Sequence, residues 1–158
     1  MASKLTLVLV GLLFAAIALY MSEAQTMGSP NNGFSFNLLG VQVTLYCTPD
    51  GNMGIFGLAT PPFKGANVML QCGNNQIITT STTNSYGITY MVTNPLPIIP
   101  FFPPQSNCKL VVNTTLSSCN PTLPSTGFLQ SPLGFLGTST IENKKVANFA
   151  PSGFHYIS

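Results

Sequence analysis

Few side chains in this sequence could perform acid–base chemistry. His155 is the single histidine, and Asp50 and Glu142 are the only carboxylate side chains beyond residue 24. A hydrolytic triad needs a nucleophile, a base and an orienting group, and a glycosidase usually needs two facing carboxylates. No recognisable motif unites these three residues. We therefore predict a protein that is not an enzyme and that has neither catalytic residues nor a cofactor.

The four cysteines are the other reactive groups. Cys47, Cys72 and Cys108 lie on the apolar faces of alternating segments, and Cys119 lies in a polar turn. An even number of cysteines in a secreted chain indicates two disulfides, for which three connectivities are possible. Spacing alone does not choose among them. Because oxidised cysteines cannot ligate zinc, we also predict no metal site.

The N-terminal segment predicts secretion. Lys4 precedes an apolar run over residues 5–21, and the small residues Ser22 and Ala24 occupy positions −3 and −1 before Gln25. This is the layout of a signal peptide, which we assign to residues 1–24. The alternative is an uncleaved anchor. Prolines interrupt the other long apolar stretch, so we expect an extracellular protein with no stable membrane insertion after cleavage.

Charge is scarce, which excludes two classes of function. Beyond residue 24 the chain carries only lysines as cations and has no arginine. Nucleic-acid binding through counterion release needs many Lys or Arg contacts to phosphates. Membrane lysis by a cationic helix needs a basic amphipathic face. Neither pattern is present.

Alternation of apolar and polar residues predicts strands. It is clear over residues 39–47, 66–72 and 108–114, and a turn at residues 84–87 separates two further strands that would form a hairpin. We expect short strands at 127–130, 146–149 and 154–157, and a loop at 131–140 with Leu133, Phe135 and Leu136 packed. Residues 53–64 are expected to form a loop packed against a sheet.

These strands define one domain without a helix of useful length. It occupies residues 38–158 and follows a flexible lead-in at residues 25–37. The predicted fold is all-β: a small disulfide-stapled antiparallel β-sandwich or Greek-key barrel.

The segment at residues 93–107 is rich in proline and apolar residues. Its five prolines exclude a helix interior or a central strand. One interpretation is a loop folded over one end of the core. The other is an exposed apolar patch that binds a partner or a surface. The patch would consist of Leu96, Ile98, Ile99, Phe101 and Phe102.

Asn113 is a predicted glycosylation site. Asn113-Thr114-Thr115 is an N-x-Thr acceptor. Alternation places Asn113 on the face opposite Cys108, Leu110 and Val112, which is the outward face. We therefore predict an N-linked glycan here.

Several segments resemble a known family. A strand ending in Cys47, PPFKGANVMLQCG at residues 61–73, a threonine-rich hairpin, NCKLVVNTTLSSC at residues 107–119 and a late PSGF are similar to the phylloplanin family. This family is related to the pollen Ole e 1/extensin-like domain. The resemblance covers nearly all of the chain after the signal peptide and implies the disulfide pairs Cys47–Cys119 and Cys72–Cys108. The proline-rich insert at residues 93–105 departs from the family pattern.

The resemblance implies a protein secreted onto the leaf surface that inhibits spore germination by fungi or oomycetes. We expect a non-enzymatic mechanism in which it binds the pathogen spore or wall surface. The alternative is a structural or polysaccharide-binding protein of the plant cell wall. A third hypothesis is carriage of a small apolar ligand in the β core.

Overall fold

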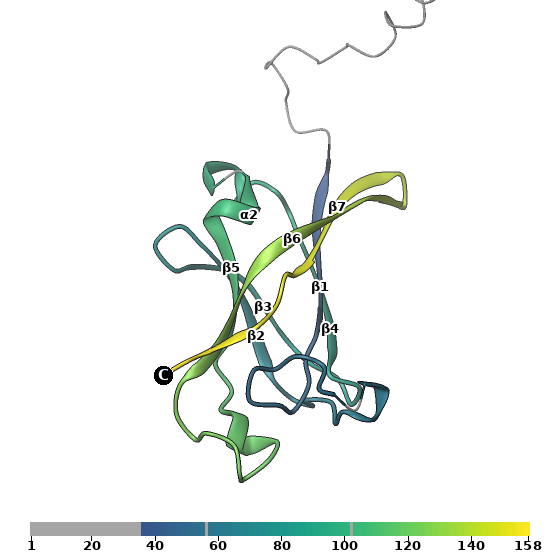
Figure 1. Ribbon diagram of the computed structural model, residues 1–158. Helices are drawn as coiled ribbons and strands as arrows, with labels where there is room; N and C mark the ends of the chain where they lie inside the picture. Colours follow the sequence, from purple (N-terminus) through teal and green to yellow (C-terminus); the bar gives the residue numbers. More distant parts are fainter. Residues whose placement is uncertain (1–35, 56, 102) are drawn as a thin grey trace, which may run out of the picture. The chain divides into compact units, whose positions relative to one another are not determined.

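The structure is a computed structural model that describes residues 36–158 except residues 56 and 102 (Figure 1). The predicted signal peptide and most of the predicted lead-in lie outside the described residues. Phe36, at the end of the lead-in, packs against the core, and the Asn37 amide donates to the Lys145 carbonyl at 2.8 Å. No helix in the described part of the chain is long and apolar enough to cross a membrane.

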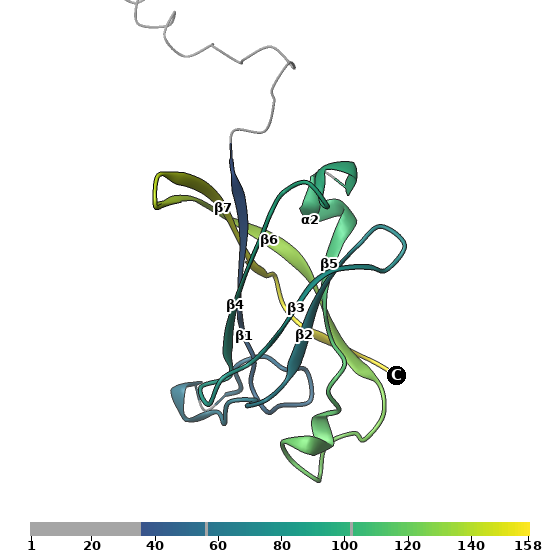
Figure 2. The ribbon, with the colours of Figure 1, turned by 180° about the vertical axis from the view of Figure 1, so that it is seen from behind.

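Eight strands form one sheet that curls into a nearly closed barrel (Figures 1 and 2). The strand order is β3-β2-β5-β6-β7-β1-β4, and β8 pairs with β6. All neighbours are antiparallel except β1 and β7, which are parallel. The strands are β1 (Leu38–Thr44), β2 (Asn67–Cys72), β3 (Gln76–Thr82), β4 (Ile88–Thr93), β5 (Cys108–Val112), β6 (Phe128–Ile141), β7 (Lys144–Pro151) and β8 (His155–Ile157). The predicted all-β class is confirmed.

The core contains the apolar faces that alternation identified. Val41 and Val43 of β1 and Leu70 of β2 are fully buried, as is Leu110 of β5. Leu70 pairs directly with Leu110 across the β2–β5 ladder. Burial of each such side chain stabilises the fold by about 1.5–3 kcal/mol. The half-buried strands were therefore predictable, because their period of two matches a sheet with one face on a core.

The predicted loop at residues 131–140 is wrong, because these residues belong to the 14-residue strand β6. Leu133 is buried as expected, but Phe135 and Leu136 are more than half exposed. Pro132, Gly134 and Gly137 give the segment the composition of a turn. The strand forms nevertheless because β5 and β8 pair with its first half and β7 pairs with its second half.

The turn at residues 84–87 is present, but the hairpin predicted around it does not form. The Asn84 side chain accepts hydrogen bonds from the backbone amides of Tyr86 and Ile88, at 2.9 and 3.0 Å. β4 then leaves β3 and pairs with β1 at the other edge of the sheet. The two edges meet through side chains instead, since the Ser81 and Thr89 hydroxyl oxygens lie 2.6 Å apart. This contact helps to close the barrel.

Candidate binding surfaces

The two carboxylate side chains of the domain lie in different loops. Asp50 lies in the loop after β1 and Glu142 lies in the β6–β7 turn, at the other end of the domain in Figure 1. His155 is exposed on β8. Among the described residues, no three His, Cys, Asp or Glu side chains are grouped so that they could hold a metal ion.

The Asp50 carboxylate has a structural role in its turn. It accepts hydrogen bonds from the Asn52 amide at 3.2 Å and the Thr48 hydroxyl at 3.1 Å. The side chain and then the backbone amide of Asn52 lower the pKa of Asp50, and partial burial opposes them. The Asn52 side chain also donates to the Phe154 carbonyl at 2.7 Å and accepts from the Phe154 amide at 3.0 Å, so the turn is fixed to the residue that directly precedes β8.

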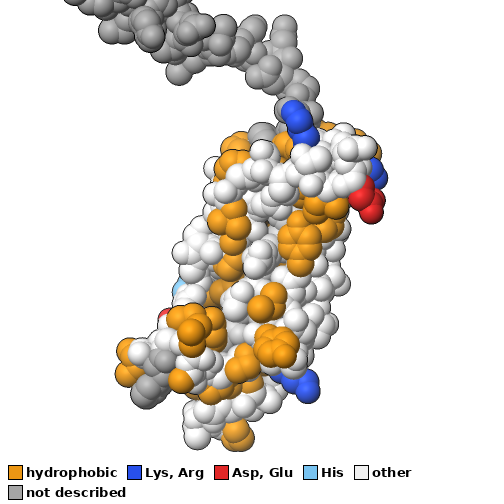
Figure 3. Space-filling view, turned by 90° about the vertical axis from the view of Figure 1, so that its right-hand side faces the viewer, with side chains coloured by type: hydrophobic (Ala, Val, Ile, Leu, Met, Phe, Trp, Pro, Cys, Tyr) orange, Lys and Arg blue, Asp and Glu red, His pale blue; other side chains and the backbone are white. Residues whose placement is uncertain are grey.

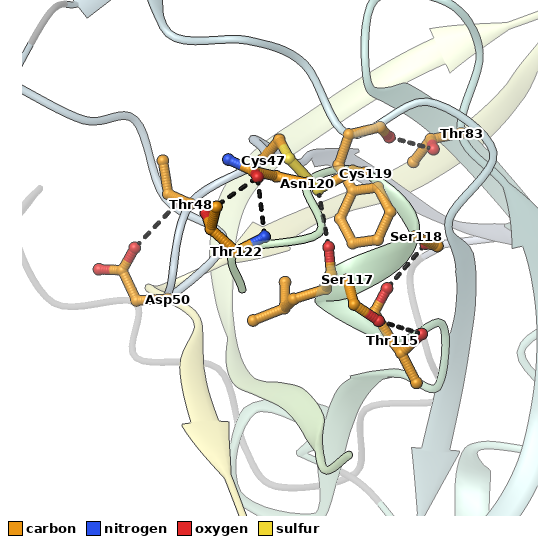
Figure 4. The surroundings of a disulfide bond; sticks show 12 residues. Cys47, Thr48, Asp50, Thr83, Thr115, Ser117, Ser118, Cys119, Asn120 and Thr122 are labelled. Carbon is orange, nitrogen blue, oxygen red and sulfur yellow. Dashed lines mark hydrogen bonds between the residues drawn. A yellow bond between two sulfur atoms is a disulfide. The ribbon is translucent and has the colours of Figure 1, made fainter. Parts of the chain in front are cut away.

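Two disulfides tie the barrel together. Cys72 and Cys108 face each other across the β2–β5 ladder, with Cα atoms 4.0 Å apart. Cys47 and Cys119 join the loop after β1 to the loop after the 3-10 helix Leu116–Ser118 (Figure 4). These are the pairs that the family resemblance implies. Around the second bridge, the Asn120 carboxamide oxygen accepts from the Thr122 amide and hydroxyl, at 3.0 and 2.9 Å.

The four described residues of the predicted apolar patch differ in exposure. Ile98 is only 1% exposed and belongs to the core, and Phe101 packs over Gly73 and against the core. Leu96 is 67% exposed and Ile99 is 39% exposed. Phe102 lies outside the described residues. The segment therefore acts partly as a cover for the core, and among its described patch residues Leu96 and Ile99 are the exposed ones.

A second exposed apolar region follows the outer face of β4 and was missed in the sequence. Ile88, Tyr90 and Val92 alternate with inward residues and are exposed. The Tyr90 ring lies over Gly40 of β1, where a Cβ atom would clash with it, and its hydroxyl donates to Asn148 of β7 at 3.2 Å. The alternation in ITYMVT, residues 88–93, could have predicted this region, because it places three large apolar residues on one face.

The loop after β1 also exposes apolar side chains. Ile55 is 96% exposed and Leu58 is 95% exposed, whereas Phe63 at the end of the same segment is buried in the core, so the predicted packing holds for the end of the loop and not for Ile55 and Leu58. Its base is held by the Gly54 amide, which donates to the Thr60 hydroxyl at 3.1 Å. In Figure 3 the apolar side chains of one face form separate clusters on a largely uncharged surface, with charged groups near its margins.

Asn113 is exposed directly after β5. The backbone amide of Asn113 donates to the Asn67 carbonyl at 3.3 Å, and the Thr114 hydroxyl accepts from the backbone amide of Asn67 at 2.8 Å. The local backbone is thus ordered and the Asn113 side chain is accessible. Glycosylation of this residue stays a prediction.

Comparison with known proteins identifies the family. Residues 35–158, which include the whole described domain, match the family model described as phylloplanin antifungal protein. The chain is 35% identical over 117 residues to phylloplanin from Nicotiana tabacum, an alignment that covers 70% of this chain and 71% of that relative. No solved structure matches the chain. With the family match spanning the entire β-barrel and its four cysteines, the chain belongs to the phylloplanin family.

Proposed function

We propose that this protein is a secreted antifungal defence protein of the plant leaf surface that inhibits germination of fungal or oomycete spores. The observation that carries the proposal is the family match over residues 35–158. The tobacco relative supports it, because its similarity extends over most of both chains. The predicted signal peptide supports export, and two disulfides suit an oxidising extracellular environment.

The proposed mechanism is binding to the spore or its wall without catalysis. Two features support it. The two carboxylates of the domain lie in different loops, Asp50 after β1 and Glu142 in the β6–β7 turn, and exposed apolar side chains occur on a surface with very little charge. Buried apolar contacts would then supply most of the affinity, so activity would depend only weakly on ionic strength.

Spore germination in the presence of the purified protein tests the proposal. The native protein is compared with the same protein after reduction and alkylation, at equal concentration. Inhibition by the native protein alone is the expected result. No inhibition across several fungal and oomycete species would overturn the antifungal assignment.

Surface variants would locate the binding face. Leu96→Ser with Ile99→Ser tests the exposed part of the proline-rich segment, and Ile55→Ser with Leu58→Ser tests the loop after β1. All four side chains are exposed, so both double variants should fold. Loss of inhibition in one double variant, with retention in the other, would assign the surface. Full retention in both would remove these side chains from the mechanism.

A second candidate function is polysaccharide binding in the plant wall. The Tyr90 ring favours it, since this ring is held by Asn148 and exposes an apolar face beside polar groups. Sugar rings pack against aromatic faces of this kind while their hydroxyls bond to neighbouring amides. Sedimentation with pectin or arabinogalactan would distinguish the two functions: retention by either polysaccharide that Tyr90→Ser abolishes, together with unaffected spores, would favour the wall role.

A further inference from the structure

A groove runs along one face of the β6–β7 hairpin, toward the turn that joins the two strands. The face consists of three successive cross-strand pairs: Phe135 with Phe149, Thr138 with Ala147, and Thr140 with Lys145. Polarity therefore changes along the groove. The first pair is aromatic, the second is small, and the third carries a hydroxyl and a cation.

A β-bulge creates this order. The register shifts between Phe135 and Gly137, so that Leu136 is the extra residue of β6. In a regular strand, residues 135 and 138 would point to opposite faces. The extra residue returns Thr138 to the face of Phe135, and Thr140 follows at the usual spacing of two.

Phe36 and Gln105 complete the walls. Gln105 belongs to the short helix α2 (Pro104–Asn107), which contacts β6. Phe36 is positioned by its neighbour Asn37, which forms two hydrogen bonds to the backbone of Lys145, at 2.8 and 2.9 Å. The Phe135 and Phe149 rings contact each other at a tilt, with centroids 5.4 Å apart.

Two hollows on this hairpin share Phe36 and Thr138 among their lining residues. One, of about 250 Å³, is lined by Phe36, Gln105, Phe135, Thr138, Ala147 and Phe149. The other, of about 190 Å³, is lined by Phe36, Thr138, Ser139, Thr140 and Lys145. Each is smaller than the roughly 300–1,000 Å³ typical of pockets for drug-sized ligands. A slender chain fits such a groove better than a polycyclic molecule.

The charge in the groove indicates which polar head group a ligand would carry. Lys145 is the only charged residue that lines either hollow. Within the described part of the chain, its ammonium group forms no ion pair or hydrogen bond. A carboxylate at this end would gain a charge-assisted contact, with the Thr140 hydroxyl as an additional donor.

We propose that this groove binds an aliphatic monocarboxylate, such as a medium-chain fatty acid. The hydrocarbon chain lies over the half-exposed Phe135, with the buried Phe149 and Ala147 forming the floor beneath it, and the carboxylate lies beside Lys145. The site is independent of the proposed antifungal activity, which rests on the family match.

Decanoate tests the proposal, with decanol as the uncharged ligand of equal chain length. Binding is measured by calorimetry on the protein that begins at Gln25, and it is located by amide chemical shifts in ¹⁵N-labelled protein. We expect saturable decanoate binding that perturbs Thr138, Thr140, Lys145 and Ala147. Affinity should rise roughly fourfold per added methylene from hexanoate to decanoate, because each methylene becomes buried. No saturable binding, or shifts confined to another face, would overturn the proposal.

Two neighbouring lysines provide matched variants. Lys145→Gln should weaken decanoate binding between about twofold and fivefold and leave decanol binding unchanged, as expected for loss of one exposed ion pair. Lys144→Gln removes the same charge from the opposite face of β7 and should change neither. Equal effects of the two substitutions on decanoate would refute a carboxylate site at Lys145. Thr138→Trp, checked for folding by circular dichroism, should block both ligands, and unchanged decanol affinity in the folded variant would also refute it.

Discussion

Ile98 and Ile99 are adjacent in the sequence and should differ sharply in their effect on stability. Ile98 is 1% exposed within the core, whereas Ile99 is 39% exposed. Ile98→Ala removes three buried carbons, worth about 2.4 kcal/mol at about 0.8 kcal/mol per buried methylene. The residual cavity adds to this loss, which gives an expected destabilisation of about 3 kcal/mol. Ile99→Ala should cost less than about 1 kcal/mol, because much of its side chain is already in water.

Urea unfolding followed by circular dichroism measures the difference. With a slope of about 1–3 kcal/mol per molar urea, Ile98→Ala should lower the midpoint by roughly 1–3 M. Ile99→Ala serves as the matched control with the same change in chemistry. Equal shifts for the two variants would refute the assignment of Ile98 to the core. The comparison also matters for function, since any test of the proline-rich segment that replaces Ile98 would confuse lost binding with lost folding.

Three other outcomes are expected. Replacing Cys72 and Cys108 by serine removes a disulfide between residues separated by 36 positions. The chain-entropy model gives a loss of about 4 kcal/mol in the free energy of unfolding, which urea unfolding measures against wild type. A loss below about 1 kcal/mol would contradict this prediction. The pKa of Asp50 is lowered in the folded state, so its contribution to the free energy of unfolding is complete above the ordinary pKa of about 3.9 and is lost as pH falls through the folded value. Asp50→Asn should therefore reduce the loss of stability at acid pH by less than about 1 kcal/mol. An unchanged dependence of stability on acid pH would argue against the Asn52 bonds. Protein secreted by plant cells should lose mass on glycosidase treatment, and Asn113→Gln should abolish that loss, whereas an unmodified wild-type protein would exclude the glycan.

Local sequence patterns predicted the strands that lie half-buried on the core. β1, β2 and β5 alternate apolar and polar residues, and a period of two requires no knowledge of the partner strands. The same pattern placed Asn113 on the outer face. β6 was missed because Pro132, Gly134 and Gly137 make the segment appear to be a loop, and its pairing with β5, β7 and β8 outweighs that local composition.

The candidate surfaces were predictable only in part. The proline-rich segment has no period, so nothing in its sequence separates the buried Ile98 from the exposed Ile99. The exposed apolar region on the outer face of β4 could have been predicted from the alternation of its residues. The groove on the β6–β7 hairpin could not, because the bulge at Leu136 reverses the faces of every residue that follows it.

The sequence by itself determined the class of the protein: a weakly charged all-β domain with an even number of cysteines. These properties depend on composition and on short-range periodicity. Only the tertiary structure decided which strands are neighbours, which apolar side chains stay in water and which meet across a groove. These properties depend on contacts between residues far apart in the chain, such as Leu38 with Val146 and Tyr90 with Asn148, and no local pattern specifies them.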